Sequence, residues 1–184
     1  MKKNFFILSI IFIFSICSCS LKYTETPNVD DIIPEFIFEN TKMTSYEKNI
    51  KKMEVNSQIV EQYKNSSQSF AKDVEFLSYD EKSELSNEGN CGYLFADSKN
   101  EIYQLYDDIS LYNHTDNIKF SADVLKWNGK TEQLTSGKSD SVKVEKDNTV
   151  IIGSGFSASG VSKSYKFTGA VSGTITDSES FEEK

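Results

Sequence analysis

Chemically reactive side chains are few in this sequence of 184 residues, and their spacing matches no catalytic or zinc-binding pattern. His114 is the single histidine, and it stands in the polar turn cluster Asn113-His114-Thr115-Asp116-Asn117. A catalytic triad needs histidine or a substitute base held beside the nucleophile, and a zinc site needs several cysteine or histidine ligands. We therefore interpret His114 as a turn residue and predict no metal site.

Two other groups invite a chemical interpretation. Asp107 and Asp108, with Glu101 nearby, could form a carboxylate pair or bind calcium. Neighbouring residues on a strand point to opposite faces, however, which favours a solvated turn or edge. Ser154 stands between two glycines but does not complete the G-x-S-x-G pattern of a nucleophile elbow, so those glycines favour a bulge or bend. The sequence predicts no enzyme and no cofactor.

The N-terminus predicts export. Lys2 and Lys3 precede an apolar run over residues 5–17, as in a secretory signal peptide. The run ends after 13 residues, short of the roughly 20 that a membrane-spanning helix needs. We predict cleavage, with an uncleaved, shortened anchor as the alternative.

Ile16, Cys17 and Ser18 directly precede Cys19, and this order resembles a bacterial lipobox. The resemblance implies that Cys19 carries the lipid of a membrane-anchored lipoprotein, since several acyl chains hold a protein firmly at a bilayer. An ordinary signal peptide with incidental cysteines is the other interpretation. Ser20 does not decide between the inner and the outer membrane.

Composition divides the remainder of the chain. Both prolines lie before residue 35 and all nine glycines after residue 88, so an extended tether precedes a turn-rich body. We expect a signal peptide at 1–18, a lipid-anchored linker at 19–34, one β domain at 35–176 and a flexible acidic tail at 177–184.

The net charge is −8 and no basic stripe is present, which argues against nucleic acid as a partner. After processing, Cys91 would be the free thiol, so no internal disulfide can form.

From Val74 onward the apolar residues alternate with polar ones, which predicts an antiparallel sheet with one buried face. Turn clusters separate the alternating segments, and Asn128-Gly129 is the strongest of them, typical of a two-residue type I′ hairpin. Residues 41–68 are ambiguous: a helical stripe with a possible Thr44/Glu47 capping box fits slightly better than a strand. The predicted class is all-β, an open antiparallel β-jellyroll or twisted β-sandwich.

The body resembles the LptC family, the periplasmic bridge of the lipopolysaccharide export machine. The matching segments are Phe36-Ile37-Phe38, Val74-Glu75-Phe76, Ile118 to Trp127, Leu134-Thr135-Ser136, Val142-Lys143-Val144, Val150 to Phe156, and a closing strand from Phe167 to Ile175 with Gly169 and Gly173. The resemblance covers about residues 34–176. It implies an open β-jellyroll that holds acyl chains, and it implies that 41–68 is strand. Many members keep an uncleaved anchor helix, whereas this chain carries a lipobox-like sequence.

The expected function is non-enzymatic: a lipid-binding bridge that receives lipopolysaccharide or a similar glycolipid from an inner-membrane ABC transporter and passes it across the periplasm. The expected site is an apolar trough lined by inward positions of the strands: Phe76, Phe120, Leu125, Trp127, Val142, Val144, Ile152, Phe156 and Phe167.

The resemblance also assigns two partner edges. The strand with Phe36, Ile37 and Phe38 would meet the transporter, and the strand with Tyr165, Phe167, Gly169 and Val171 would pair with the next periplasmic β-jellyroll. The expected location is the periplasm, anchored to the inner membrane, with the outer membrane possible. The alternative is a structural or adhesive surface lipoprotein with a closed sandwich and no trough.

Overall fold

The computed structural model describes residues 33–63, 67–161 and 163–176. These residues form strands and turns and no helix, which confirms the all-β prediction. The predicted signal peptide, Cys19, most of the linker and the acidic tail lie outside the described residues. Within the described ranges no helix has the length and hydropathy to span a membrane.

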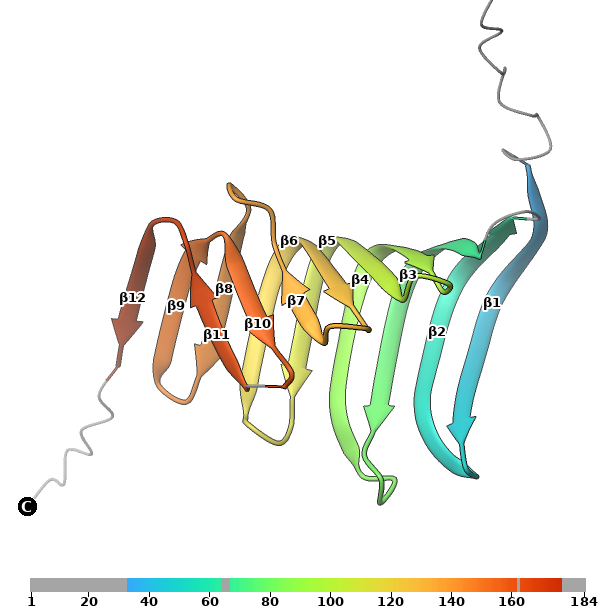
Figure 1. Ribbon diagram of the computed structural model, residues 1–184, viewed down its shortest axis with the longest axis horizontal. Coiled ribbons are helices and arrows are strands. Elements are labelled where there is room, and N and C mark those ends of the chain that lie inside the picture. Colours follow the sequence, from blue (N-terminus) through green and yellow to red (C-terminus); the bar gives the residue numbers. More distant parts are fainter. Residues whose placement is uncertain (1–32, 64–66, 162, 177–184) are drawn as a thin grey trace, which may run out of the picture.

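Twelve strands follow one another along the chain (Figure 1), and the first six are the longest. They are β1 (Pro34–Glu47), β2 (Ile50–Tyr63), β3 (Gln68–Tyr79), β4 (Leu85–Asp97), β5 (Ile102–Asn113), β6 (Ile118–Asn128), β7 (Gln133–Thr135), β8 (Ser141–Lys146), β9 (Thr149–Ser154), β10 (Phe156–Ser159), β11 (Ser164–Phe167) and β12 (Val171–Ile175).

All strand pairs are antiparallel, and β1 to β6 pair in chain order. The sheet then divides at β6, because Ile118–Ala122 pair with β8 whereas Lys126–Asn128 pair with β7. One branch continues as β7-β10-β11 and the other as β8-β9-β12. The sheet never closes: β1 lies at one end and β12 at the other (Figure 1).

The long strands bend in the middle, where residues with positive φ interrupt the regular pleat. Asn40 in β1, Asp73 in β3, and Asp107 and Asp108 in β5 have φ of 48°, 51°, 66° and 46°. Aspartate and asparagine adopt this left-handed conformation more readily than other non-glycine residues. The bend, rather than catalysis, accounts for the Asp107-Asp108 pair.

Each bend lets both halves of a strand turn their apolar side chains to the same core. In β3 Ala71 and Val74, three residues apart, both pack in the core, although a regular strand would place them on opposite faces. Cys91 and Leu94 in β4 repeat this spacing. We call the face that carries this core the inner face.

The two branches beyond β6 pack against each other around Phe156, which is fully buried. The chain passes from β9 in one branch to β10 in the other through Gly155, whose φ is 64°. A side chain there would collide with Thr168. The glycines around Ser154 therefore mark a bend, as the sequence analysis expected.

Two local predictions need correction. Residues 41–68 contain the end of β1, all of β2 and the start of β3, so the helical stripe and the capping box were wrong and the strand implied by the family resemblance is right. The β6–β7 connection is a four-residue loop at 129–132 and not a two-residue hairpin at Asn128-Gly129. The Asn128 side-chain oxygen accepts a hydrogen bond from the Thr131 N–H at 3.1 Å, which stabilises the longer loop.

Candidate functional site

The inner face changes from exposed to buried along the sheet. On β1 and β2 it carries Phe36, Phe38, Met43 and Met53, of which Phe36 and Phe38 are 50% and 46% exposed. The register places them on the inner face, because Phe38 pairs with buried Val60, and Met43 pairs with Val55, which packs against the core. We call these four residues the N-terminal inner surface.

The N-terminal inner surface includes both halves of the bent strands. Phe36 and Phe38 precede the bend at Asn40, and their rings stack with centroids 6.0 Å apart. Met43 follows it, and Met53 lies on the corresponding half of β2. Clustered exposed apolar side chains are unusual on a soluble domain and mark a binding surface. The unbranched methionine side chain also adapts to ligands of irregular shape.

Further along the sheet four aromatic rings pack together on the inner face: Phe156, which is buried, and Phe120, Tyr165 and Phe167, which are partly buried. Their centroid separations range from 5.4 Å for Phe156–Phe167 to 6.4 Å for Phe120–Tyr165. Phe120 comes from the part of β6 that pairs with β8, whereas the other three come from β10 and β11, so the rings join the two branches. We call these four residues the aromatic cluster.

Gly153 leaves room for one of these rings. Gly153 in β9 has no side chain, and a Cβ atom built on it would lie 2.7 Å from the Phe167 ring and 3.1 Å from a Val171 methyl carbon. Phe167 thus reaches from β11 to the opposite branch and occupies the place that a side chain at 153 would take.

Beyond the aromatic cluster the inner face becomes exposed again on the last strand. Val171 pairs with Gly153, and Ile175 pairs with Thr149; their side chains are 55% and 73% exposed. We call Val171 and Ile175 the C-terminal inner surface. The molecule therefore has an exposed apolar inner surface at each end and a buried section between them.

Three strands have a free edge among the described residues: β1, β11 and β12. Two backbone hydrogen bonds flank β12: Ser154 N–H donates to the Ala170 carbonyl at 3.3 Å, and Thr176 N–H donates to the Asn148 carbonyl at 3.0 Å. Because hydrogen-bonded pairs alternate along an antiparallel ladder, Ser172 and Thr174 bond to β9, and the peptide groups of Val171, Gly173 and Ile175 face outward. Such outward groups can add a strand from another chain.

A cluster of charges ties the β1 edge to its neighbours on the outer face. The Glu54 carboxylate in β2 accepts from Lys42 Nζ of β1 at 2.7 Å and from Lys51 Nζ at 2.5 Å. Lys51 also donates to the Tyr79 hydroxyl at 3.1 Å. The hydrogen bonds from Lys42 and then Lys51 lower the pKa of Glu54, so it stays ionised.

The described residues contain no group of three histidine, cysteine or acidic side chains that could hold a metal ion. His114 Nε2 lies 3.5 Å from Glu88, and its ring packs edge-on against Tyr112 at a turn. Cys91 is buried in the core, and burial raises the pKa of its thiol to about 11.

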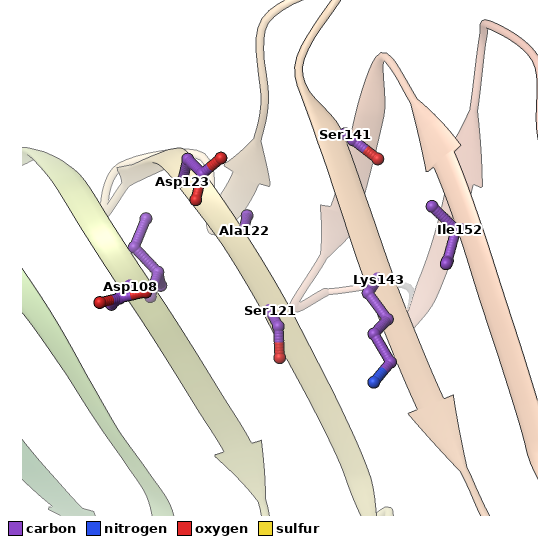
Figure 2. Close-up of a pocket in the computed structure, with 8 residues that line it drawn as sticks. Asp108, Ser121, Ala122, Asp123, Ser141, Lys143 and Ile152 are labelled. Carbon is purple, nitrogen blue, oxygen red and sulfur yellow. The ribbon is translucent and has the colours of Figure 1, made fainter.

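A depression of about 440 Å³ lies at the bend and not on the exposed inner surfaces. Figure 2 shows Asp108, Asp123 and Lys143 at its border, on three different strands, with their charged groups apart. Lys143 is instead paired with Glu145 at 2.8 Å. The depression is shallow and its charges do not converge, so it forms no recognisable catalytic site.

The family model for lipopolysaccharide-assembly, LptC-related proteins matches residues 7–176, nearly the whole chain. The chain belongs to the LptC family. This membership confirms the suspected resemblance and assigns the LptC domain to lipopolysaccharide transport in the cell envelope, a periplasmic role associated with the inner membrane. The family is one of transport bridges rather than of known enzymes. A comparison with curated proteins finds no significant match.

The structure brings together most of the nine residues predicted to line the trough, but it buries four of them and leaves four partly buried. Leu125, Val142, Val144 and Phe156 are fully buried, and Phe76, Phe120 and Phe167 pack around them. Trp127 lies on the inner face between Tyr103 and Leu134. The inward placement of Ile152 is wrong: it pairs with Lys143, is 42% exposed and borders the depression of Figure 2.

The predicted closing strand of this domain also differs from the structure. Tyr165 and Phe167 belong to β11, Val171 belongs to β12, and Gly169 lies in the connection between them. A close approach explains the break, because a Cβ at Gly169 would collide with Ser154. One predicted edge is therefore two edges, one in each branch.

Sequence reasoning missed Met43 and Met53, and it assigned Phe36 and Phe38 to partner contact alone. Both methionines fall in residues 41–68, where the spacing of the apolar residues fitted both a helix and a strand. The alternation Met53, Val55, Ser57 was a signal that could have placed Met53 on the inner face.

Proposed function

We propose that this LptC-family domain receives lipopolysaccharide or a similar glycolipid from an inner-membrane ABC transporter and passes it across the periplasm, with the acyl chains on its inner face. The observation that carries the proposal is the N-terminal inner surface, which exposes aromatic and methionine side chains on both halves of the bent strands. Family membership supplies the class of ligand.

The physical reason is the cost of exposing acyl chains to water. Each exposed CH₂ group costs about 0.8 kcal/mol, so a lipid with several chains needs a continuous apolar surface during transfer. The rings of Phe36 and Phe38 and the flexible side chains of Met43 and Met53 provide such a surface at the first strand of the sheet.

The free edges support the bridging part of the proposal. The β1 edge, with Phe36, Ile37 and Phe38, would meet the transporter, and the edges at the other end would pair with the next periplasmic β-jellyroll. The two ends of the sheet are distinct, which suits a chain that has one neighbour on each side (Figure 1). Attachment to the membrane through a lipid on Cys19 would keep the β1 edge near the transporter.

A photo-crosslinking amino acid at position 38 tests the proposal in cells that carry the export machinery. We expect glycolipid to be captured from Phe38 and not from Ile37, the adjacent outer-face residue, which is 58% exposed and serves as the matched control. Equal capture at both positions, or none at position 38, would refute acyl-chain binding on the inner face.

The buried middle of the domain gives some support to the alternative, a structural or adhesive surface lipoprotein with a sealed sandwich. That function predicts no capture at position 38 and no lipid on the purified chain. The same crosslinking experiment therefore separates the two functions.

A further inference from the structure

We propose that the aromatic cluster is an internal stop that separates two acyl-binding surfaces, so that a lipid bound at the N-terminal inner surface cannot reach the C-terminal inner surface until β11 moves. This inference rests on the proposed function. It concerns where along the inner face acyl chains can lie.

The first observation is the burial sequence along the inner face. Phe36 and Phe38 are about half exposed, Leu125, Val144 and Phe156 are at most 1% exposed, and Ile175 is 73% exposed. A side chain without accessible surface is packed by protein on all sides and leaves no room for an acyl chain. Between the two exposed ends the inner face is therefore filled by protein side chains at these residues, and the rings of Phe120, Tyr165 and Phe167 pack against them in a partly buried state.

The second observation is how the stop is built. Phe120 comes from the branch that leads to β8, and Phe156, Tyr165 and Phe167 come from the branch that leads to β11. Phe167 also fills the space above Gly153 of the opposite branch. Any chain that passed between the branches would first have to displace these rings.

The third observation identifies the movable part. Tyr165 and Phe167 lie on β11, an edge strand that pairs only with β10, through four residue pairs. After β11, Thr168 N–H donates to the Gly155 carbonyl at 3.2 Å, and Gly169 N–H donates to the Ser154 carbonyl at 3.0 Å. Phe120, in contrast, lies on β6, which is paired on both sides. Displacement of β11 would remove two of the four rings while leaving the long strands in place.

The test follows lipid along the inner face of the full-length protein in membrane vesicles that contain its transporter and ATP, without the downstream partner. Photo-crosslinkers are placed at Phe38 and at Ile175, each in the wild-type background and with Phe167→Ala. We expect capture at position 38 in both backgrounds, and capture at position 175 only with Phe167→Ala, rising there toward the level at position 38.

Phe70→Ala is the matched control, because Phe70 contacts Tyr63 and Phe95 in a group outside the core and the substitution is the same. It should leave position 175 silent. Phe167→Leu, which keeps most of the apolar volume, covers the case in which Phe167→Ala does not fold, and it should give intermediate capture at position 175.

Capture at position 175 in the wild-type background, or silence there in both Phe167 variants while position 38 is labelled, would overturn the internal stop. Silence at position 38 in every background would instead overturn the proposed function. The two failures are therefore distinguishable.

Discussion

At the scale of single residues, burial divides the apolar inner-face residues into two groups with different roles. Leu125 is fully buried at the point where the sheet divides, whereas Phe38 is half exposed at the first strand. Both are apolar and both face inward, so their types alone do not reveal the difference. The first group holds the fold together, and the second is available to a ligand.

We expect Leu125→Ala to lower the free energy of unfolding by about 2–5 kcal/mol, because it removes buried volume that the surrounding strands cannot refill. Phe38→Ala should cost about 1 kcal/mol or less, since its ring is already half in water. Urea unfolding of the two variants measures both values. Equal losses would mean that Phe38 is a core residue and not part of a binding surface.

Cys91 should be unreactive in the folded protein. In a variant with Cys17→Ser and Cys19→Ser it is the only thiol, and we expect a thiol reagent at pH 8 to label it only after unfolding. The physical reason is that the thiolate is the reactive form, and burial raises the thiol pKa from 9.0 to about 11. Rapid labelling of the native protein would contradict the buried position.

The same pKa shift predicts the effect of alkaline pH. The folded state favours the protonated thiol, so Cys91 contributes to the free energy of unfolding. That contribution is complete below pH 9.0 and is lost as the pH rises toward about 11. It should amount to on the order of 2 kcal/mol. Comparison with Cys91→Ala isolates it from the tyrosines and lysines that titrate in the same range, because the alanine variant lacks this one group.

At the scale of elements, β12 at the end of the sheet can add a strand from another protein without losing its backbone hydrogen bonds to β9. In β12 the peptide groups of Ser172 bond to β9, and those of Val171 face outward. The two adjacent residues thus differ in which chain their backbone can bind. This difference makes a matched pair of proline variants possible.

Val171→Pro should abolish co-purification with the downstream β-jellyroll protein while the domain stays folded, because proline removes only an outward N–H donor. Ser172→Pro should instead detach β12 from β9 and lower the melting temperature. Co-purification followed by thermal unfolding measures both effects. Unchanged co-purification of Val171→Pro would show that this part of β12 is not the pairing edge.

At the scale of the whole molecule, the two different ends of the sheet suit a bridge protein. The first strand and the last strands lie at opposite ends (Figure 1), and each end exposes an apolar inner surface beside a free edge. A bridge needs one neighbour on each side, and this arrangement gives each neighbour both a backbone edge and an apolar surface.

Membrane attachment through a lipid on Cys19 is a prediction from the sequence, and Cys19 lies outside the described residues. We expect Cys19→Ser to shift the protein from the membrane fraction to the soluble fraction, because the lipid would be lost. Cys17→Ser is the control and should leave the protein in the membrane fraction. Retention of the Cys19→Ser protein in the membrane would favour an uncleaved anchor.

The sequence by itself determined the all-β class and most inner-face positions, since alternation with a period of two is a local property of a strand. It also indicated a bulge or bend at the two glycines beside Ser154, and the structure places the positive φ at Gly155, where glycine tolerates a conformation that other residues avoid. It misplaced Ile152, because adjacent Ile151 and Ile152 leave the phase of the alternation undecided, and only pairing with Lys143 settles it.

Only the tertiary structure decided which inner-face residues are accessible. Phe38 and Phe156 both lie on the inner face, yet one is half exposed and the other is buried, because β1 is an edge strand whereas β10 packs across from the branch that contains β8 and β9. Burial depends on which strands pack across from a residue, and those contacts join segments far apart in the chain. Local sequence therefore fixes the face of a side chain but not what covers it.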